Sequence, residues 1–92
     1  MTRDEIQDVV FRCFRRIAPE IEPEEIAPEV PFRAQLDIDS MDYLNIMICI
    51  YNQLGVEIPE EDYGKLTTLD RTVTYLAEAL SRQQGGVTDA ID

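Results

Sequence analysis

The fold is decided by the stretch from Asp39 to Gly55, which reads DSMDYLNIMICIYNQLG. Asp39 can accept a hydrogen bond from the free amides of a helix that begins near Ser40, and Asp42 lies in the same first turn. Gly55 is the residue type that most readily adopts the left-handed conformation in which helices end. The stretch therefore predicts a helix over residues 40–54.

This helix is unusual because residues 43–54 carry no charge in an otherwise acidic chain. A helix that buries one face normally places ionic residues on the other. We therefore expect either broad burial or an apolar surface that a partner covers, and weigh partner contact above burial. Helical spacing turns one set of residues toward the core: Ile46, Met47, Ile50 and Leu54. A second set of residues is predicted to lie partly on the outward side of the helix: Met41, Leu44, Ile48 and Tyr51.

Upstream, the spacing of the apolar residues predicts another helix over residues 3–17, which begins at Thr2 or Arg3. Residues 18–38 hold four of the five prolines, so we expect a long loop there that packs across the helix ends. The apolar residues of the helix recur at intervals of three and four: Ile6, Val9, Val10, Cys13, Phe14 and Ile17. The apolar anchors of the loop are Ile21, Ile26, Val30, Phe32 and Leu36.

Downstream, Pro59 and the acidic residues after it predict a short helix around residues 60–63. Thr67 or Thr68 can cap a last helix that ends near Gln83. Residues 84–92 begin with a glycine pair and lack periodicity, so we expect a flexible tail after a domain of residues 1–83. The buried side of the last helix is predicted to include Leu69, Val73, Leu76, Ala77 and Leu80.

Length and composition set the class of protein. The 92 residues, 45% hydrophobic and 29% charged, predict one small globular domain. A net charge of -11 disfavours nucleic acid and anionic membrane surfaces and favours a basic partner. No apolar run approaches the roughly 20 residues that a membrane span needs, and the N-terminus has no signal-peptide pattern. We therefore expect a cytoplasmic protein.

Several chemistries can be set aside from the residue types. The chain has no histidine, which removes the commonest general base and metal ligand. Its two cysteines, Cys13 and Cys49, are too few for a thiolate zinc site and lie in apolar helical patterns, so we expect buried thiols rather than a disulfide or a reactive thiol. The acids at Asp37 and Asp39 suggest a calcium loop, but Asp42 and Ile48 stand where that loop needs glycine and glutamate. No metal site is predicted.

Ser40 remains as a hydroxyl beside an acid at a helix start. Catalysis by this serine is disfavoured, because no G-x-S-x-G surrounds it and Lys65 is the only lysine available as a base. Taken alone, Ser40 is most simply a residue that caps the helix. Its wider context favours a different role.

The chain resembles the acyl carrier protein family over roughly residues 3–82. The resemblance rests on Asp39-Ser40-Met41-Asp42, on the helix that follows, and on the segment from Gly55 to Asp62, GVEIPEED. It also includes the proline-bearing loop with Pro23-Glu24-Glu25-Ile26 and Thr67-Thr68-Leu69 before the last helix. The implied fold is an all-α, four-helix bundle with a long loop between helices 1 and 2 and a short third helix.

The resemblance implies a non-catalytic carrier. In the family, the serine that matches Ser40 bears a covalent 4′-phosphopantetheine arm derived from coenzyme A, whose thiol carries acyl groups as thioesters. The implied partners are a phosphopantetheinyl transferase, which uses magnesium, and the acyl-loading, acyl-transfer or synthase enzymes of lipid metabolism such as fatty acid biosynthesis. Asp39 is expected to support the modification, and shuttling between partners favours a monomer.

Departures from the family refine this expectation. Asp37 stands where many members have glycine, and Asn45, Tyr51 and Asn52 stand where carriers of fatty-acid synthesis usually have glutamates. A carrier dedicated to a specialised lipid, polyketide or secondary-metabolite pathway is therefore at least as well supported as a general one. Two alternatives remain: an aminoacyl or peptidyl carrier, in which histidine commonly precedes the serine, and an unmodified helical adaptor. The expected partner contacts are Met41, Leu44, Asn45, Ile48 and Tyr51.

Overall fold

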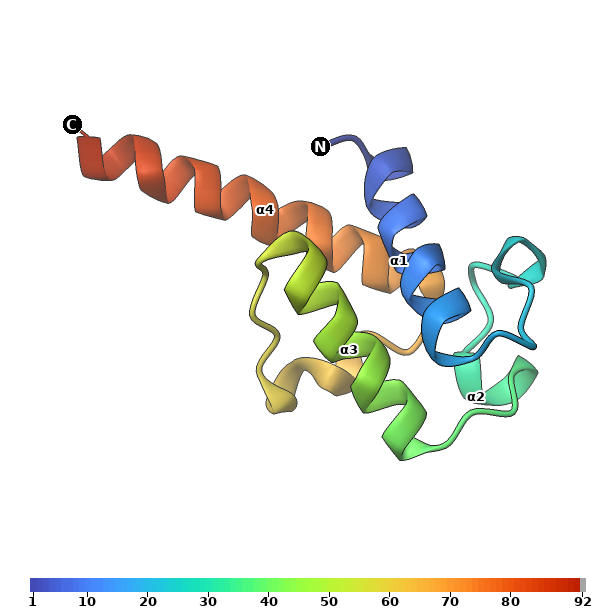
Figure 1. Ribbon diagram of the computed structural model, residues 1–92. Helices are drawn as coiled ribbons and strands as arrows, with labels where there is room; N and C mark the ends of the chain where they lie inside the picture. The colour runs from blue at the N-terminus through green and yellow to red at the C-terminus, as the bar shows by residue number, and fades with distance from the viewer. Residues whose placement is uncertain (92) are drawn as a thin grey trace.

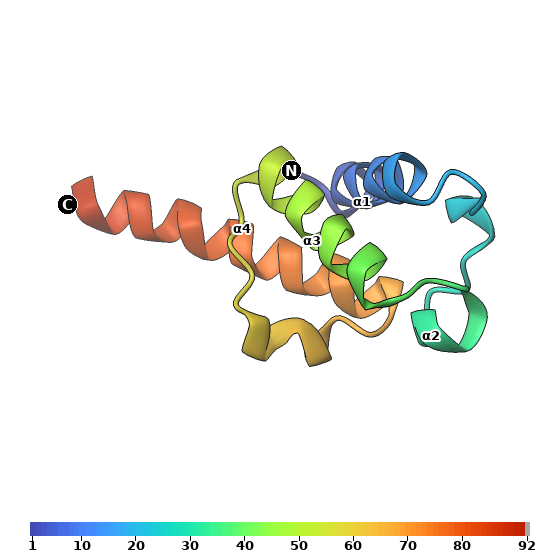
Figure 2. The same cartoon turned by 60° about the horizontal axis from the view of Figure 1, so that its bottom comes forward.

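The computed structural model describes the backbone of residues 1–91 and the side chains of residues 1–82. Its long helices are α1 (Arg3–Ile17), α3 (Ser40–Leu54) and α4 (Leu69–Ile91). Helix α1 packs against both α3 and α4, and α4 crosses behind the other two (Figure 1). In the view turned by 60°, the C-terminal part of α4 extends beyond the other helices (Figure 2). The helical-bundle prediction is confirmed, and residues 1–91 contain no strand.

Local signals set the bounds of α1 and α3. The Thr2 hydroxyl accepts a hydrogen bond from the Glu5 amide at 3.1 Å, and the Glu5 carboxylate accepts one from the Thr2 amide at 2.8 Å. This reciprocal capping satisfies two amides that have no partner within the helix. Helix α3 ends at Gly55, whose φ of 71° lies in the left-handed region that favours glycine. Both helices have the predicted bounds.

The segment between α1 and α3 is a loop with two short helical turns, η1 (Pro23–Glu25) and α2 (Phe32–Gln35). Ile26 and Phe32 are buried, as predicted for anchors. The prediction was wrong for Val30, which is exposed at the end of a turn closed by the hydrogen bond from its amide to the Ala27 carbonyl oxygen. The Phe32 amide donates to the carbonyl oxygen of Thr67 at 2.8 Å, which joins the loop to the segment before α4.

The short third helix is the 3-10 helix η2 (Glu60–Lys65), and Thr68 caps α4 by accepting a hydrogen bond from the Arg71 amide at 3.1 Å. Helix α4 continues to Ile91, so the predicted end near Gln83 was wrong. A glycine costs only about 1 kcal/mol inside a helix, which a continuing helical backbone can tolerate. Flexibility of residues 84–92 remains a prediction, and Asp92 lies outside the described residues.

The core fills the space between α1, α3 and α4. Leu69, Val73 and Leu76 of α4 are buried as predicted, while Ala77 and Leu80 are only partly buried. Burying such apolar side chains is the main favourable contribution to folding. The largest side chains that are almost fully buried include Ile6, Phe14, Ile46, Ile50, Leu66, Leu69 and Leu76.

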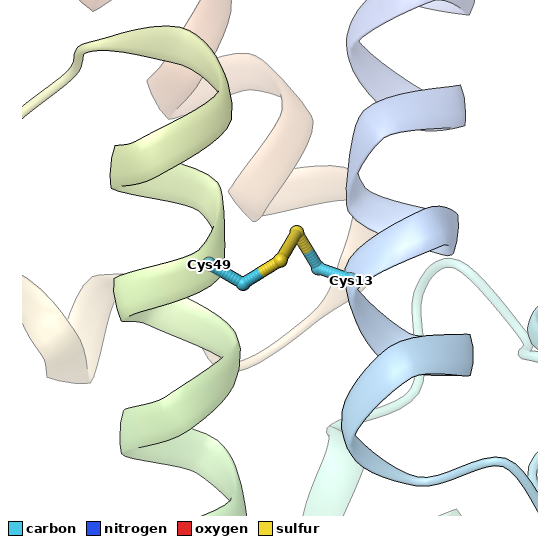
Figure 3. The surroundings of a disulfide bond; sticks show 2 residues. All are labelled: Cys13 and Cys49. Atoms are coloured by element: carbon cyan, nitrogen blue, oxygen red, sulfur yellow. A yellow bond between two sulfur atoms is a disulfide. The ribbon is translucent and has the colours of Figure 1, made fainter.

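Cys13 and Cys49 form a disulfide that joins the middle of α1 to α3 (Figure 3). The expectation of two free thiols was therefore wrong. Each cysteine lies on the buried side of its own helix, and the packing of α1 against α3 brings their Cα atoms to 5.7 Å, within the usual range for a disulfide. Spacing within one helix could not reveal this pairing, because it depends on how two helices separated by a long loop pack.

Candidate functional site

Asp39 and Ser40 lie together at the start of α3. Asp39 has an extended backbone, and its Oδ1 accepts a hydrogen bond from the Asp42 amide at 2.8 Å. Its carbonyl oxygen accepts a second from the Tyr43 amide at 3.0 Å. These bonds begin the helix at Ser40, and the side chain of Ser40 is exposed. Ser40 is therefore accessible from outside the protein.

A cavity of about 530 Å³ adjoins Ser40. Its walls come from α2, from the start of α3, which follows α2 closely in the chain, and from η2, which is more distant in sequence. Most of the exposed lining is apolar, so the cavity can receive an apolar group attached near the helix start. The lining residues are Pro31, Phe32, Arg33, Ile38, Asp39, Ser40, Tyr43, Leu44, Glu60, Tyr63, Gly64 and Thr67.

Tyr43 fixes the wall between α3 and η2. Its hydroxyl lies within hydrogen-bond distance of two carbonyl oxygens, that of Leu66 at 2.9 Å and that of Tyr63 at 3.1 Å. The Tyr43 and Tyr63 rings meet edge to face with centroids 6.1 Å apart. Burial, with a smaller contribution from Tyr63, raises the pKa of Tyr43 to about 12, so the hydroxyl stays a neutral donor at neutral pH.

The electrostatic surroundings of Ser40 combine acids with one cation. Asp37, Asp39 and Asp42 lie within three residues of it in the chain, and Arg33 lies in the wall of the same cavity. The N-terminus of α3 adds the partial positive charge of its free amides. Within the described residues, no group of three or more acids, cysteines or histidines could hold a metal ion. The Ser40 hydroxyl therefore lies among acids, at the positive end of a helix and in a cavity that one cation also lines.

The outward side of α3 exposes large apolar residues, as predicted. Met41 is 63% exposed, Ile48 47% and Tyr51 50%, and Asn45 is exposed beside them. Leu44 is partly buried and also lines the cavity. We call the surface formed by Met41, Leu44, Asn45, Ile48 and Tyr51 the α3 outer face. The predicted inward set is confirmed, since Ile46, Met47 and Ile50 are buried and Leu54 is partly buried.

Sequence reasoning missed the cavity residues contributed by α2 and η2, above all Arg33 and Tyr63. These residues lie in a proline-rich loop and a short acidic segment that give no periodic signal. Only the folding of those segments against α3 brings them beside Ser40.

Comparisons with known proteins match the part of the chain that contains Ser40. A family model described as the phosphopantetheine attachment site matches residues 8–76. The acyl carrier protein of Rubrobacter xylanophilus is 34% identical over 58 residues, which cover 63% of this chain and 72% of that protein. The meromycolate extension acyl carrier protein of Mycobacterium leprae is 45% identical over 56 residues, 61% of this chain and 49% of that protein. The alignment thus covers only about half the length of the mycobacterial relative. The region matched by the family model includes Ser40, α3 and η2.

Proposed function

Since the chain belongs to the acyl carrier proteins, whose cofactor is covalently attached 4′-phosphopantetheine, we propose that the Ser40 hydroxyl is the attachment point. The observation that carries this proposal is the exposed serine at the start of α3, directly after the Asp39 cap and beside an apolar cavity. When bound, the arm supplies a terminal thiol that holds acyl groups as thioesters. The family is non-catalytic, and the chain's own residues present the hydroxyl, hold the helix start and contact partners.

The attachment is a phosphoryl transfer catalysed by a separate phosphopantetheinyl transferase. The Ser40 oxygen forms a bond to the phosphorus of the phosphopantetheine part of coenzyme A, and the phosphoanhydride bond breaks. Adenosine 3′,5′-bisphosphate is the leaving group, and the serine proton passes to a base on the transferase. In this proposal Asp39 supports the step by fixing the first turn of α3, so that the Ser40 oxygen stays at the surface. The new phosphodiester lies near the free amides of the helix start, which favour negative charge.

We propose that the α3 outer face docks the transferase and the acyl-transfer or synthase enzymes. Its large side chains are exposed and uncharged, while Glu57 and Glu60 beyond the end of α3 are acidic and exposed. A partner with an apolar contact surface and a basic rim would complement this arrangement. Ile48→Asp is expected to raise the KM of the transferase for the chain. The matched control is Gln53→Asp, which adds the same charge to α3 outside the outer face. Equal KM values for the two variants would contradict this assignment.

We further propose a specialised pathway rather than general fatty-acid synthesis. The absence of charge over residues 43–54 of α3 supports this, and so does the similarity to carriers named for meromycolate extension. The test is to isolate the chain from its host, release the arm in the mass spectrometer and identify the acyl group. An acyl group longer than those of ordinary fatty-acid synthesis, or modified beyond them, supports the proposal, and an ordinary straight saturated chain would contradict it. An aminoacyl group would assign an aminoacyl or peptidyl carrier. If the isolated chain has no arm and is held in a permanent complex with one partner, the protein would instead be an unmodified helical adaptor.

The same proposal includes a cytoplasmic monomer. No helix within the described residues is long and apolar enough to cross a membrane. Glutathione keeps most cytosolic cysteines reduced, so the Cys13–Cys49 bond must resist exchange there. Cys13 is fully buried and Cys49 is 8% exposed, and burial of this kind limits attack by an external thiol. Alkylation of a cell extract under denaturing conditions should therefore label neither cysteine before reduction.

A further inference from the structure

Arg33 is the one cation in the wall of the cavity beside Ser40. The other charged residues that line this cavity are acids, Asp39 and Glu60. Asp37 and Asp42 add further negative charge within three residues of Ser40 in the chain. A phosphodiester attached to Ser40 would bring one more negative charge into this acidic environment. A nearby cation would offset the repulsion.

The backbone that bears Arg33 is held firmly. Its neighbour Phe32 is 2% exposed, and the Phe32 ring packs against Phe14 of α1 with centroids 5.3 Å apart. Two residues on, the Gln35 side chain accepts a hydrogen bond from the Ala27 amide and donates to the Ala27 and Val30 carbonyl oxygens, each at 2.9 Å. These contacts fix α2 against the loop and the core, so Arg33 is presented at the cavity wall without further ordering of the backbone.

Arg33 also differs from the paired cations of the chain. Arg3 pairs with Asp70, Arg15 with Glu24, and Lys65 with Asp62. Among the side chains that the structure describes, no carboxylate lies within ion-pair distance of Arg33, although it is exposed in an acidic protein. Its positive charge acts on the nearby Tyr43, one turn along α3 from Ser40. Its guanidinium is therefore available to a ligand in the cavity that Ser40 also lines.

From these observations we propose that Arg33 binds the phosphate group that joins the arm to Ser40. A guanidinium presents paired N–H donors that match two phosphate oxygens, which a lysine ammonium cannot reproduce with the same geometry. Arg33 thereby holds the first part of the arm at the mouth of the cavity. This inference rests on the proposed attachment at Ser40.

The test compares the loaded and unloaded forms of the parent chain, Arg33→Gln and Arg33→Lys. Arg16→Gln is the matched control, because Arg16 is an exposed arginine on α1 that does not line the cavity. The first measurement is the phosphorus NMR signal of the loaded chain. Arg33→Gln should shift and narrow this signal, Arg33→Lys should retain part of the parent's behaviour, and Arg16→Gln should leave it unchanged.

The second measurement is the change in the unfolding equilibrium constant on loading. The factor by which loading lowers this constant should be roughly two- to fivefold smaller in Arg33→Gln than in the parent. That is the size expected for one exposed charge-assisted pair. Equal phosphorus signals and equal loading effects in the parent and Arg33→Gln would overturn the inference. Slower loading of Arg33→Gln with both readouts unchanged would also overturn it, since Arg33 would then contact the transferase. If the parent gains no arm, the proposed attachment itself fails.

Discussion

Reduction of the Cys13–Cys49 disulfide should destabilise the fold strongly. The bond joins residues 36 positions apart, across the interface of α1 and α3. In the chain-entropy description, closing a loop of this length in the unfolded state stabilises the folded state by about 3 to 4 kcal/mol. Small domains have a total free energy of unfolding of only about 5 to 15 kcal/mol. The loss therefore corresponds to a fall in melting temperature of roughly 15 to 25 °C.

The assay is urea denaturation followed by circular dichroism, with and without a phosphine reductant. Thiol titration in denaturant should find no free thiol before reduction and two after it. The reduced parent should unfold at markedly lower urea, while the Cys13→Ala/Cys49→Ala variant should show no response to the reductant. If the thiol count changes from zero to two and the midpoints coincide, the loop-closure reasoning is refuted. Two thiols before reduction would refute the pairing itself.

Three further predictions concern the ends of α3 and the region of η2. Asp39→Ala should lower the free energy of unfolding by about 1 kcal/mol by removing the bond to the Asp42 amide, whereas Asp39→Asn, which keeps an acceptor, should lose less in the same urea titration. Gly55→Ala should lower the free energy of unfolding by about 1 to 2 kcal/mol, because the left-handed backbone is strained for alanine even though the added methyl meets no atom within 4 Å. A urea midpoint equal to the parent's would contradict this. The hydrogen bond from Tyr75 to Asp62, with a smaller contribution from Lys65, lowers the pKa of Asp62, and the same bond raises the pKa of Tyr75 to about 12. The stability that Asp62 contributes should therefore be full above its unfolded pKa and lost as the pH falls through the lowered value, and the stability that Tyr75 contributes should be full below pH 10 and lost as the pH rises toward about 12. Tyr75→Phe should flatten both flanks of a plot of melting temperature against pH. Parallel curves for the parent and the variant would be evidence against this pair.

The features predicted well from the sequence are those that depend on local chemistry. Helix α3 begins at Ser40 because the Asp39 side chain caps it, and it ends at Gly55 because glycine accepts a positive φ. The start of α1 was predicted at Thr2 or Arg3, and the structure shows that reciprocal capping by Thr2 and Glu5 sets it there. Ile48 is exposed, as predicted for the outward side of the helix. Each of these inferences needs only residues within a few turns of one another.

The features that sequence reasoning missed depend on contacts between distant segments. Cys13 pairs with Cys49 only because α1 packs against α3. Arg33 reaches the wall beside Ser40 only because Phe32 anchors α2 in the core. The continuation of α4 past Gln83 was missed for another reason, since glycine weakens a helix without always ending it.

Intact mass spectrometry can show whether the Ser40 hydroxyl accepts the arm. The chain is incubated with coenzyme A, magnesium and a broad-specificity phosphopantetheinyl transferase, and Ser40→Ala is treated in the same way. The parent should gain the mass of one phosphopantetheine and Ser40→Ala should gain none. A parent chain whose mass does not change, or an increase that persists in Ser40→Ala, would mean that Ser40 is not the attachment point.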